Sequence, residues 1–175
     1  MEFIETNIKD LFIIKNLSFN DERGFFTKTF NSEKFKENNI DFITKEFFYS
    51  ISNKNVIRGM HFQTYPYECA KLVFVSSGKI LDVVLDIREK SNTYGKYFKI
   101  ELSYENNTSI FIPKGFAHGF LALEDNSIVN YLQSQIYSSE HDSGIKYDSF
   151  GFDWNVKSPI ISKKDLILNN FIISA

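Results

Sequence analysis

Several residue types on which common kinds of protein depend are scarce in this sequence. It has a single cysteine, Cys69, which excludes a disulfide-stabilised scaffold and fits a reducing compartment such as the cytoplasm. No run of about eighteen apolar residues occurs, so we expect no membrane-spanning helix and no membrane partner. The N-terminal residues, MEFIE, are acidic and lack the basic start of a signal peptide. These absences together predict a cytoplasmic protein.

An excess of charge of either sign is also missing. The formal net charge is −2, so nothing in the charge indicates a nucleic-acid partner. No low-complexity linker, tandem repeat or heptad run interrupts the chain. With 175 residues, of which 43% are hydrophobic and 24% charged, we expect one globular domain over residues 1–175.

Short β-rich segments and aromatic residues are what the sequence does have. The 19 Phe and 9 Tyr are expected mainly in a core and at an interface. Segments spaced by about ten residues with turn signals between them are typical of an all-β sandwich or barrel. The expected strands cover residues 11–14, 56–63, 71–75, 80–87, 97–102, 109–113, 120–123 and 128–133. We expect a short helix at residues 33–37, capped by Asn31 or Ser32, and a second helical turn within residues 162–168.

Histidine is rare, and two of the three histidines stand in unusual surroundings. His61 and His118 each lie among apolar residues and close to a glycine and a cation. One such histidine is more often a hydrogen-bonded core residue than a catalyst. Two of them in similar settings favour a functional site.

Three common kinds of site are not supported by the motifs. A histidine-rich metal site needs a second histidine near His61, but that position holds Gln63, so we expect no metal. Neither a nucleophile elbow nor a signature around Cys69 indicates covalent catalysis. The glycines are too scattered for a phosphate-binding loop, so any phosphate must be held by side chains, for which Arg23 and Arg58 are the natural candidates.

Seven segments, in order along nearly the whole chain, resemble the dTDP-4-dehydrorhamnose 3,5-epimerase family. They are residues 21–26 (DERGFF), 58–63 (RGMHFQ), 70–73 (AKLV), 91–96 (SNTYGK), 112–120 (IPKGFAHGF), 151–154 (GFDW) and 158–165 (SPIISKKD). The resemblance implies a cupin-type jelly roll with a few short helices. It also implies an epimerase without a cofactor, which acts on a nucleotide-linked 4-keto-6-deoxy sugar in surface polysaccharide synthesis. The family forms homodimers in which an N-terminal strand joins the partner's sheet, so a homodimer is expected here.

The resemblance also implies roles for individual residues. His61 matches the catalytic base, Asp165 its carboxylate partner, Tyr131 the acid on the opposite face of the sugar and Lys71 the lysine beside the ketone. Further residues are implied to contact the substrate, namely Arg23, Phe26, Lys28, Glu46, Phe48, Arg58, Gln63, His118, Tyr137, Asp142 and Lys164. The chemistry is sound, because a ketone at C4 acidifies the protons on C3 and C5, and an imidazole fixed by a carboxylate can remove them.

The sequence departs from the family pattern at the nucleotide end of the site. Lys28 stands where the family usually has Glu, Glu46 and Phe48 replace a Gln and an Asn, and Phe74 replaces an Arg. Asp142 replaces a usual Glu. These changes suggest a different nucleotide, such as GDP, with the sugar chemistry retained.

Several alternatives to the 3,5-epimerase remain open from the sequence. The sugar could be a GDP-linked 6-deoxy-4-keto heptose, as in capsule synthesis. Inversion could be confined to C3, which needs only one proton exchange. An isomerase that moves the keto group is disfavoured by Gln63, because that class tends to have a second histidine there. A non-enzymatic sugar-nucleotide-binding cupin would have no reason to keep His61, Lys71, Tyr131 and Asp165 together.

Overall fold

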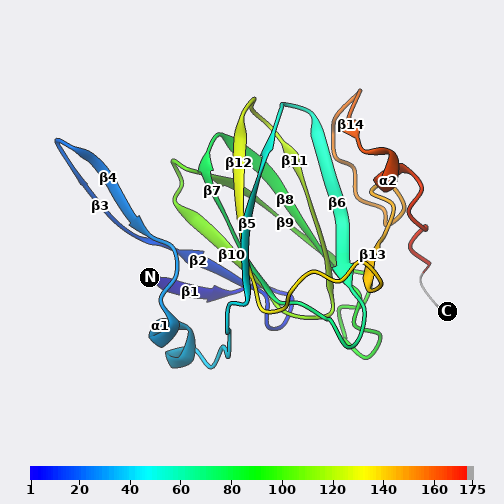
Figure 1. The fold of residues 1–175 in the computed structure, drawn as a ribbon, viewed down its shortest axis with the longest axis horizontal. Helices are drawn as coiled ribbons and strands as arrows, with labels where there is room; N and C mark the ends of the chain where they lie inside the picture. The colour runs from blue at the N-terminus through cyan, green and yellow to red at the C-terminus, as the bar shows by residue number, and fades with distance from the viewer. Residues whose placement is uncertain (173–175) are drawn as a thin grey trace.

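The computed structural model describes residues 1–172, and nearly all of their regular secondary structure is strand (Figure 1). The two helices are short, α1 (Ser32–Glu37) and α2 (Lys163–Leu166). The strands are β1 (Glu2–Glu5), β2 (Phe12–Lys15), β3 (Leu17–Asp21), β4 (Gly24–Lys28), β5 (Glu46–Ser52), β6 (Val56–Gln63), β7 (Lys71–Ser77), β8 (Lys79–Asp86), β9 (Tyr97–Ser103), β10 (Thr108–Ile112), β11 (Phe116–Ala122), β12 (Ser127–Gln133), β13 (Asp142–Gly144) and β14 (Ile160–Ile161).

Two sheets form the body of the molecule. The first has the strand order β1-β2-β10-β7-β12-β5, and the second has the order β13-β6-β11-β8-β9 with β14 alongside β6. All the pairings are antiparallel except that of β14 with β6. From β5 to β13, strands that follow one another along the chain alternate between the sheets, except that β8 and β9 pair within the second sheet, as in a jelly roll. The fold is therefore the cupin-type β-sandwich that the sequence predicted.

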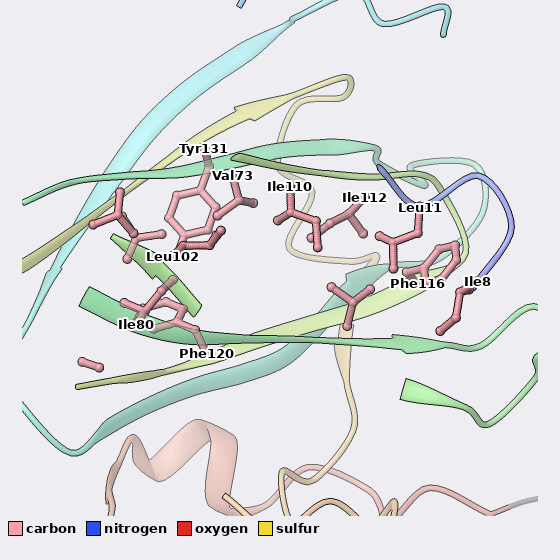
Figure 2. Close-up of a cluster of buried hydrophobic side chains, with 14 residues drawn as sticks. Ile8, Leu11, Val73, Ile80, Leu102, Ile110, Ile112, Phe116, Phe120 and Tyr131 are labelled. Atoms are coloured by element: carbon pink, nitrogen blue, oxygen red, sulfur yellow. The ribbon is translucent and has the colours of Figure 1, made fainter. Parts of the chain in front are cut away.

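The main core lies between the inner faces of the two sheets. Figure 2 shows Val73, Ile110 and Tyr131 of the first sheet above Ile80 and Phe120 of the second. All of these side chains are buried, since alternate residues of each strand point inward. Tyr131 is the only one that carries a polar group, and this group lies at the end of the core where the sandwich opens into a cavity.

Both sheets are also covered on part of their outer faces. Phe35 of α1 is fully buried against the first sheet, together with Phe42 and Phe111. The segment after β13 covers the second sheet with Phe152 and Trp154 among others. This second cover brings the C-terminal part of the chain, including α2, beside β6 (Figure 1).

The expected elements are largely confirmed, with small changes in their bounds. Asn31 caps α1 by accepting hydrogen bonds from the backbone N–H groups of Glu33 and Lys34, and Ser162 caps α2. Each of the eight expected strands corresponds to an observed one, from β2 to β12. No strand was expected for β1, β3, β4, β5, β13 or β14, which are edge, isolated or very short strands.

The hairpin β3–β4 stands apart from both sheets. It forms a two-stranded sheet of its own and projects away from the sandwich (Figure 1). Three of its phenylalanines, Phe19, Phe25 and Phe26, are 54% to 61% exposed. Within residues 1–172, no helix is long and apolar enough to cross a membrane.

Candidate active site

One cavity of about 620 Å³ opens between the two sheets next to α2. Both sheets supply its walls, so groups on facing strands can approach a bound molecule from opposite sides. Its polar lining consists of Ser50, Arg58, His61, Gln63, Cys69, Lys71, His118, Tyr131, Gln133, Tyr137, Asp142, Ser162, Lys164 and Asp165.

His61 and Asp165 form a hydrogen-bonded pair on one side of the cavity. His61 lies on β6, Asp165 lies in α2, and Nε2 of the imidazole is 2.8 Å from Oδ1 of the carboxylate. The side chain of Asp165 is buried, whereas that of His61 is 35% exposed toward the cavity. Because the carboxylate accepts from Nε2–H, the other ring nitrogen, Nδ1, is the one that can take up a proton.

The carboxylate of Asp165 is held in its charged form. Burial acts to raise its pKa, but the hydrogen bond with His61 and the nearby N–H of Gly59 outweigh burial and keep the pKa below its usual value. The backbone N–H of Asp165 donates to Oγ of Ser162, which fixes the first turn of α2. Asp165 is therefore a rigid, charged partner for the imidazole.

Two facing glycines allow β6 and β11 to come close beside this pair. A Cβ atom on Gly59 would lie 2.5 Å from Cα of Gly119, and φ of Gly59 is +129°, which side chains rarely adopt. The register pairs His61 directly with His118. The glycines thus bring the two histidines to the same end of the second sheet.

Lys71 enters the cavity from β7, on the first sheet. Its side chain is buried, and its Nζ donates to the carbonyl oxygen of His61 at 3.3 Å. Burial lowers the pKa of this ammonium group, although the charges of Asp82 and Asp142 oppose the shift. Lys71 is thus a poorly solvated cation with hydrogen-bonding capacity to spare, since only one of its three protons is donated.

Tyr131 lies on β12 and reaches the cavity from the first sheet, opposite His61. Its hydroxyl group is 3.5 Å from Oγ of Ser50, and its ring stacks on Phe48 at a centroid distance of 4.8 Å. Burial raises the pKa of the phenol above its usual value. The group is therefore protonated over the physiological range and can act as an acid toward a strongly basic carbon.

His118 forms a second histidine–carboxylate pair deeper in the cavity. Its Nε2 is 2.8 Å from Oδ2 of Asp82, and both side chains are almost wholly buried. The other oxygen of Asp82, Oδ1, has no hydrogen-bond partner among the described residues. Asp82 was not predicted from the sequence. The sequence feature that could have indicated Asp82 is its position as a carboxylate within the otherwise apolar expected strand of residues 80–87.

A polar group of three residues lies at the mouth of the cavity. The hydroxyl of Tyr137 donates to Oδ2 of Asp142 at 3.0 Å, and the ammonium group of Lys164 pairs with the same oxygen. The three come from the β12–β13 connection, from β13 and from α2. Arg58 also lines the cavity, and it donates to Oγ of Ser52 and the carbonyl oxygen of Ile51.

The family model described as dTDP-4-dehydrorhamnose 3,5-epimerase matches residues 5–172. This chain belongs to that family. Among its relatives, the dTDP-4-dehydrorhamnose 3,5-epimerase of Methanothermobacter thermautotrophicus is 45% identical over 93% of this chain and 90% of its own length. As members of the family are epimerases, the chain is an isomerase of this class.

Solved structures of epimerases agree with this assignment. The dTDP-4-dehydrorhamnose 3,5-epimerase of Bacillus anthracis, with TDP and PPi bound, has a TM-score of 0.94 at 37% identity, covering 97% of this chain and 99% of that one. The dTDP-6-deoxy-D-glucose-3,5-epimerase of Legionella pneumophila, in complex with dTDP-4-keto-L-rhamnose, has a TM-score of 0.92 at 35% identity, covering 97% and 92%. The GDP-linked alternative is not favoured by these names.

The epimerase residues predicted from the sequence fall into two groups in the structure. Most of them line one cavity, namely Phe48, Arg58, His61, Gln63, Lys71, His118, Tyr131, Tyr137, Asp142, Lys164 and Asp165. Arg23, Phe26 and Lys28 lie on the projecting hairpin and do not line it. Glu46, the first residue of β5, does not line the cavity either, but its carboxylate accepts a hydrogen bond from the backbone N–H of Tyr137 at 3.0 Å.

No group of three or more His, Cys, Asp or Glu side chains that could hold an ion occurs in residues 1–172. Cys69 is buried in the cavity wall, where its thiol donates to the carbonyl oxygen of Ala70 and lies near the side-chain oxygen of Gln133. Its surroundings give it a packing role.

Proposed function

We propose that this chain inverts C3 and C5 of a dTDP-linked 4-keto-6-deoxy sugar, the substrate class named by its relatives. One observation carries the proposal. The His61–Asp165 pair, with its 2.8 Å hydrogen bond, lies on the second sheet, and Tyr131 faces it from the first sheet across a single cavity. A base and an acid on opposite sides of a ring are what inversion at carbon requires.

The residues suggest a sequence of proton transfers. Neutral His61 takes the proton from C3 or C5, and Asp165 stabilises the imidazolium that forms. The electron pair of the broken C–H bond moves into the enolate, whose oxygen receives a hydrogen bond from the buried Lys71. Tyr131 then donates its proton to the same carbon from the other face, and the C4 ketone re-forms. Solvent returns one proton to Tyr131 and removes one from His61.

The low solvation of Lys71 and Tyr131 supports these roles. A cation in a dry cavity interacts more strongly with a developing enolate than a cation in water does, because little water is present in the cavity to screen the two charges. Burial keeps the phenol of Tyr131 protonated until a basic carbanion is present. Arg58, at the cavity, carries the charge that a diphosphate needs.

Two variants test this division of labour by proton NMR in deuterated water. His61→Asn removes the base, so it should abolish both epimerisation and solvent exchange at C3 and C5. Tyr131→Phe keeps the base but loses the acid, so it should still exchange protons while inverting carbon at least about 100-fold more slowly. Retained exchange in His61→Asn, or full inversion by Tyr131→Phe, would contradict the proposal.

We further propose that the active form is a homodimer. The hairpin β3–β4 exposes Phe19, Phe25 and Phe26 and projects away from the sandwich, and Arg23 in its turn does not line the cavity of its own chain. A second copy of the chain would cover these aromatic faces and would receive Arg23 at its own cavity. This arrangement would explain why Arg23, Phe26 and Lys28 match substrate contacts of the family although they do not line the cavity of their own chain.

A further inference from the structure

The segment between β12 and β13, residues 134–141, has no regular secondary structure. It carries Tyr137, which together with Asp142 and Lys164 forms the rim of the cavity. The side chain of Tyr137 is mostly exposed, and the polar contact of its hydroxyl is with Asp142. A connection of this kind is mobile unless other groups satisfy its backbone. What holds Tyr137 in place therefore matters for the substrate contact expected of it.

Side chains from both sheets hold the backbone of this segment. The amide of Gln63 donates from Nε2 to the carbonyl oxygen of Ile136 at 3.1 Å and accepts at Oε1 from the N–H of Ser138 at 2.7 Å. Oε2 of Glu46 accepts from the N–H of Tyr137 at 3.0 Å. Backbone groups of three successive residues, with Tyr137 in the middle, are thus fixed by two side chains.

The amide of Gln63 is fully engaged in this task. Its second Nε2 proton goes to the carbonyl oxygen of Tyr67 at 2.9 Å, so both of its donors bind backbone. Only one orientation of the amide satisfies two carbonyl oxygens and one N–H group at once. Because Gln63 lies on β6 and Glu46 on β5, the contacts also tie the segment to both sheets at the cavity mouth.

We propose that Gln63 and Glu46 are positioning residues that fix Tyr137 at the rim through the backbone of residues 136–138. This inference rests on the proposed function and on the substrate contact that the family resemblance implies for Tyr137. In place of the direct substrate contacts that the resemblance implied for them, Gln63 and Glu46 act on the substrate only through Tyr137. They therefore contribute to substrate binding and leave proton transfer by His61 and Tyr131 unaffected.

Amide hydrogen exchange tests the structural half of the proposal without any substrate. Gln63→Ala should speed exchange of the Ser138 N–H, and Glu46→Ala should speed that of Tyr137, each by about tenfold or more. Glu46→Gln keeps the accepting oxygen, so protection of the Tyr137 N–H should survive in that variant. Unchanged protection in the two alanine variants would overturn the proposal.

A double-mutant cycle tests the functional half. We expect Gln63→Ala and Tyr137→Ala each to raise KM about tenfold while kcat changes less than about threefold, since a loosely held contact weakens binding. The double variant should be no worse than Tyr137→Ala alone. Multiplying effects would show that Gln63 meets the substrate directly, and would overturn the proposal.

A matched control variant and the amide hydrogen exchange measurement allow the positioning role of Gln63 and Glu46 to be tested separately from the proposed epimerase function. Asn106 also donates from its side-chain amide to a backbone carbonyl, that of Glu101, but far from the rim. Asn106→Ala should leave KM unchanged, and a rise equal to that in Gln63→Ala would overturn a specific effect on the rim. If the wild type fails to epimerise the sugar, the proposed function fails, whereas the exchange measurement still decides how Tyr137 is held.

Discussion

The two histidine–carboxylate pairs of the cavity differ in ways that suit different tasks. His61 is partly exposed and Asp165 is held charged, so the pair can take up a proton from a bound molecule. His118 and Asp82 are almost wholly buried, so that pair is better suited to orienting a hydrogen bond than to exchanging protons with water. This difference in exposure supports the proposal that His61, and not His118, is the base.

Lys71 offers a sharp test at the level of one residue. Lys71→Met removes the charge but nearly keeps the shape, so folding should be preserved while kcat falls by roughly 100-fold or more, as on loss of an oxyanion donor. Thermal unfolding provides the control for structure. Because burial lowers the pKa of Lys71, the folded protein gains nothing from its charge, and the melting temperature should stay equal or rise. A fully active variant would exclude Lys71 from enolate stabilisation.

The sequence predicted some site residues better than others, for physical reasons. His61 and Asp165 are 104 residues apart, so no spacing rule could pair them, and their match to the family did so instead. Asp82 was missed because a buried carboxylate in an apolar strand cannot be told from a solvent-facing one until its partner is known. The resemblance singled out Glu46 and Gln63 as substrate contacts. Their hydrogen bonds to the backbone of residues 136–138 could not be predicted, because the sequence does not determine the path of that loop.

At the level of elements, the strands with long apolar runs and the cleanly alternating edge strand β9 were predicted, whereas most of the other edge or very short strands were not. β7, β8, β10, β11 and β12 contain apolar runs that bury their side chains, so composition reveals them. β5 is an edge strand with most residues exposed, and β14 has only two residues, so pairing with neighbours defines them. Helix α1 was predicted with Asn31 as one of two candidate caps, because a capping side chain next to a helical segment is a local signal.

The connection after β8 depends on one carboxylate. Asp86 accepts hydrogen bonds from Arg88, Ser91 and Thr93, and Arg88 also pairs with Asp10 near the N-terminus. Burial acts to raise the pKa of Asp86, but these hydrogen bonds outweigh it and hold the pKa at about 2. Since the pKa is depressed in the folded state, the stabilisation is complete above the unfolded value of about 4 and is lost as the pH falls toward 2.

Asp86→Asn should therefore lower the free energy of unfolding by about 2 kcal/mol near neutral pH. The difference from the wild type should shrink steadily between about pH 4 and pH 2, as the wild-type carboxylate becomes protonated. Urea unfolding of both proteins across this range measures it, and the subtraction removes the effects of other carboxylates. A difference that stays constant down to pH 2 would show that the charge of Asp86 is not what stabilises this connection.

At the level of the whole molecule, the hairpin β3–β4 predicts a site completed by two chains. If Arg23 acts in the partner's cavity, mixing Arg23→Ala and His61→Asn chains should restore activity, because one of the two sites in a mixed dimer is then intact. The mixture should regain about a quarter of the wild-type rate per chain when half of the dimers are mixed. Neither variant alone should be active at more than a few per cent.

Controls decide between arrangements of the dimer. Sedimentation of the wild type should give twice the mass of one 20.4 kDa chain. A mixture that stays as inactive as its parents, while sedimentation shows that mixed dimers have formed, would place Arg23 in the cavity of its own chain or outside any site. A monomer that is fully active would contradict the dimer itself.

The central claim is that one base and one acid act on both carbons that flank the ketone. The most direct measurement follows a dTDP-linked 4-keto-6-deoxy sugar by proton NMR in deuterated water with the wild-type protein. We predict loss of the proton signals at C3 and at C5, together with inversion at both carbons. Exchange confined to C3, or inversion without uptake of deuterium, would contradict this account.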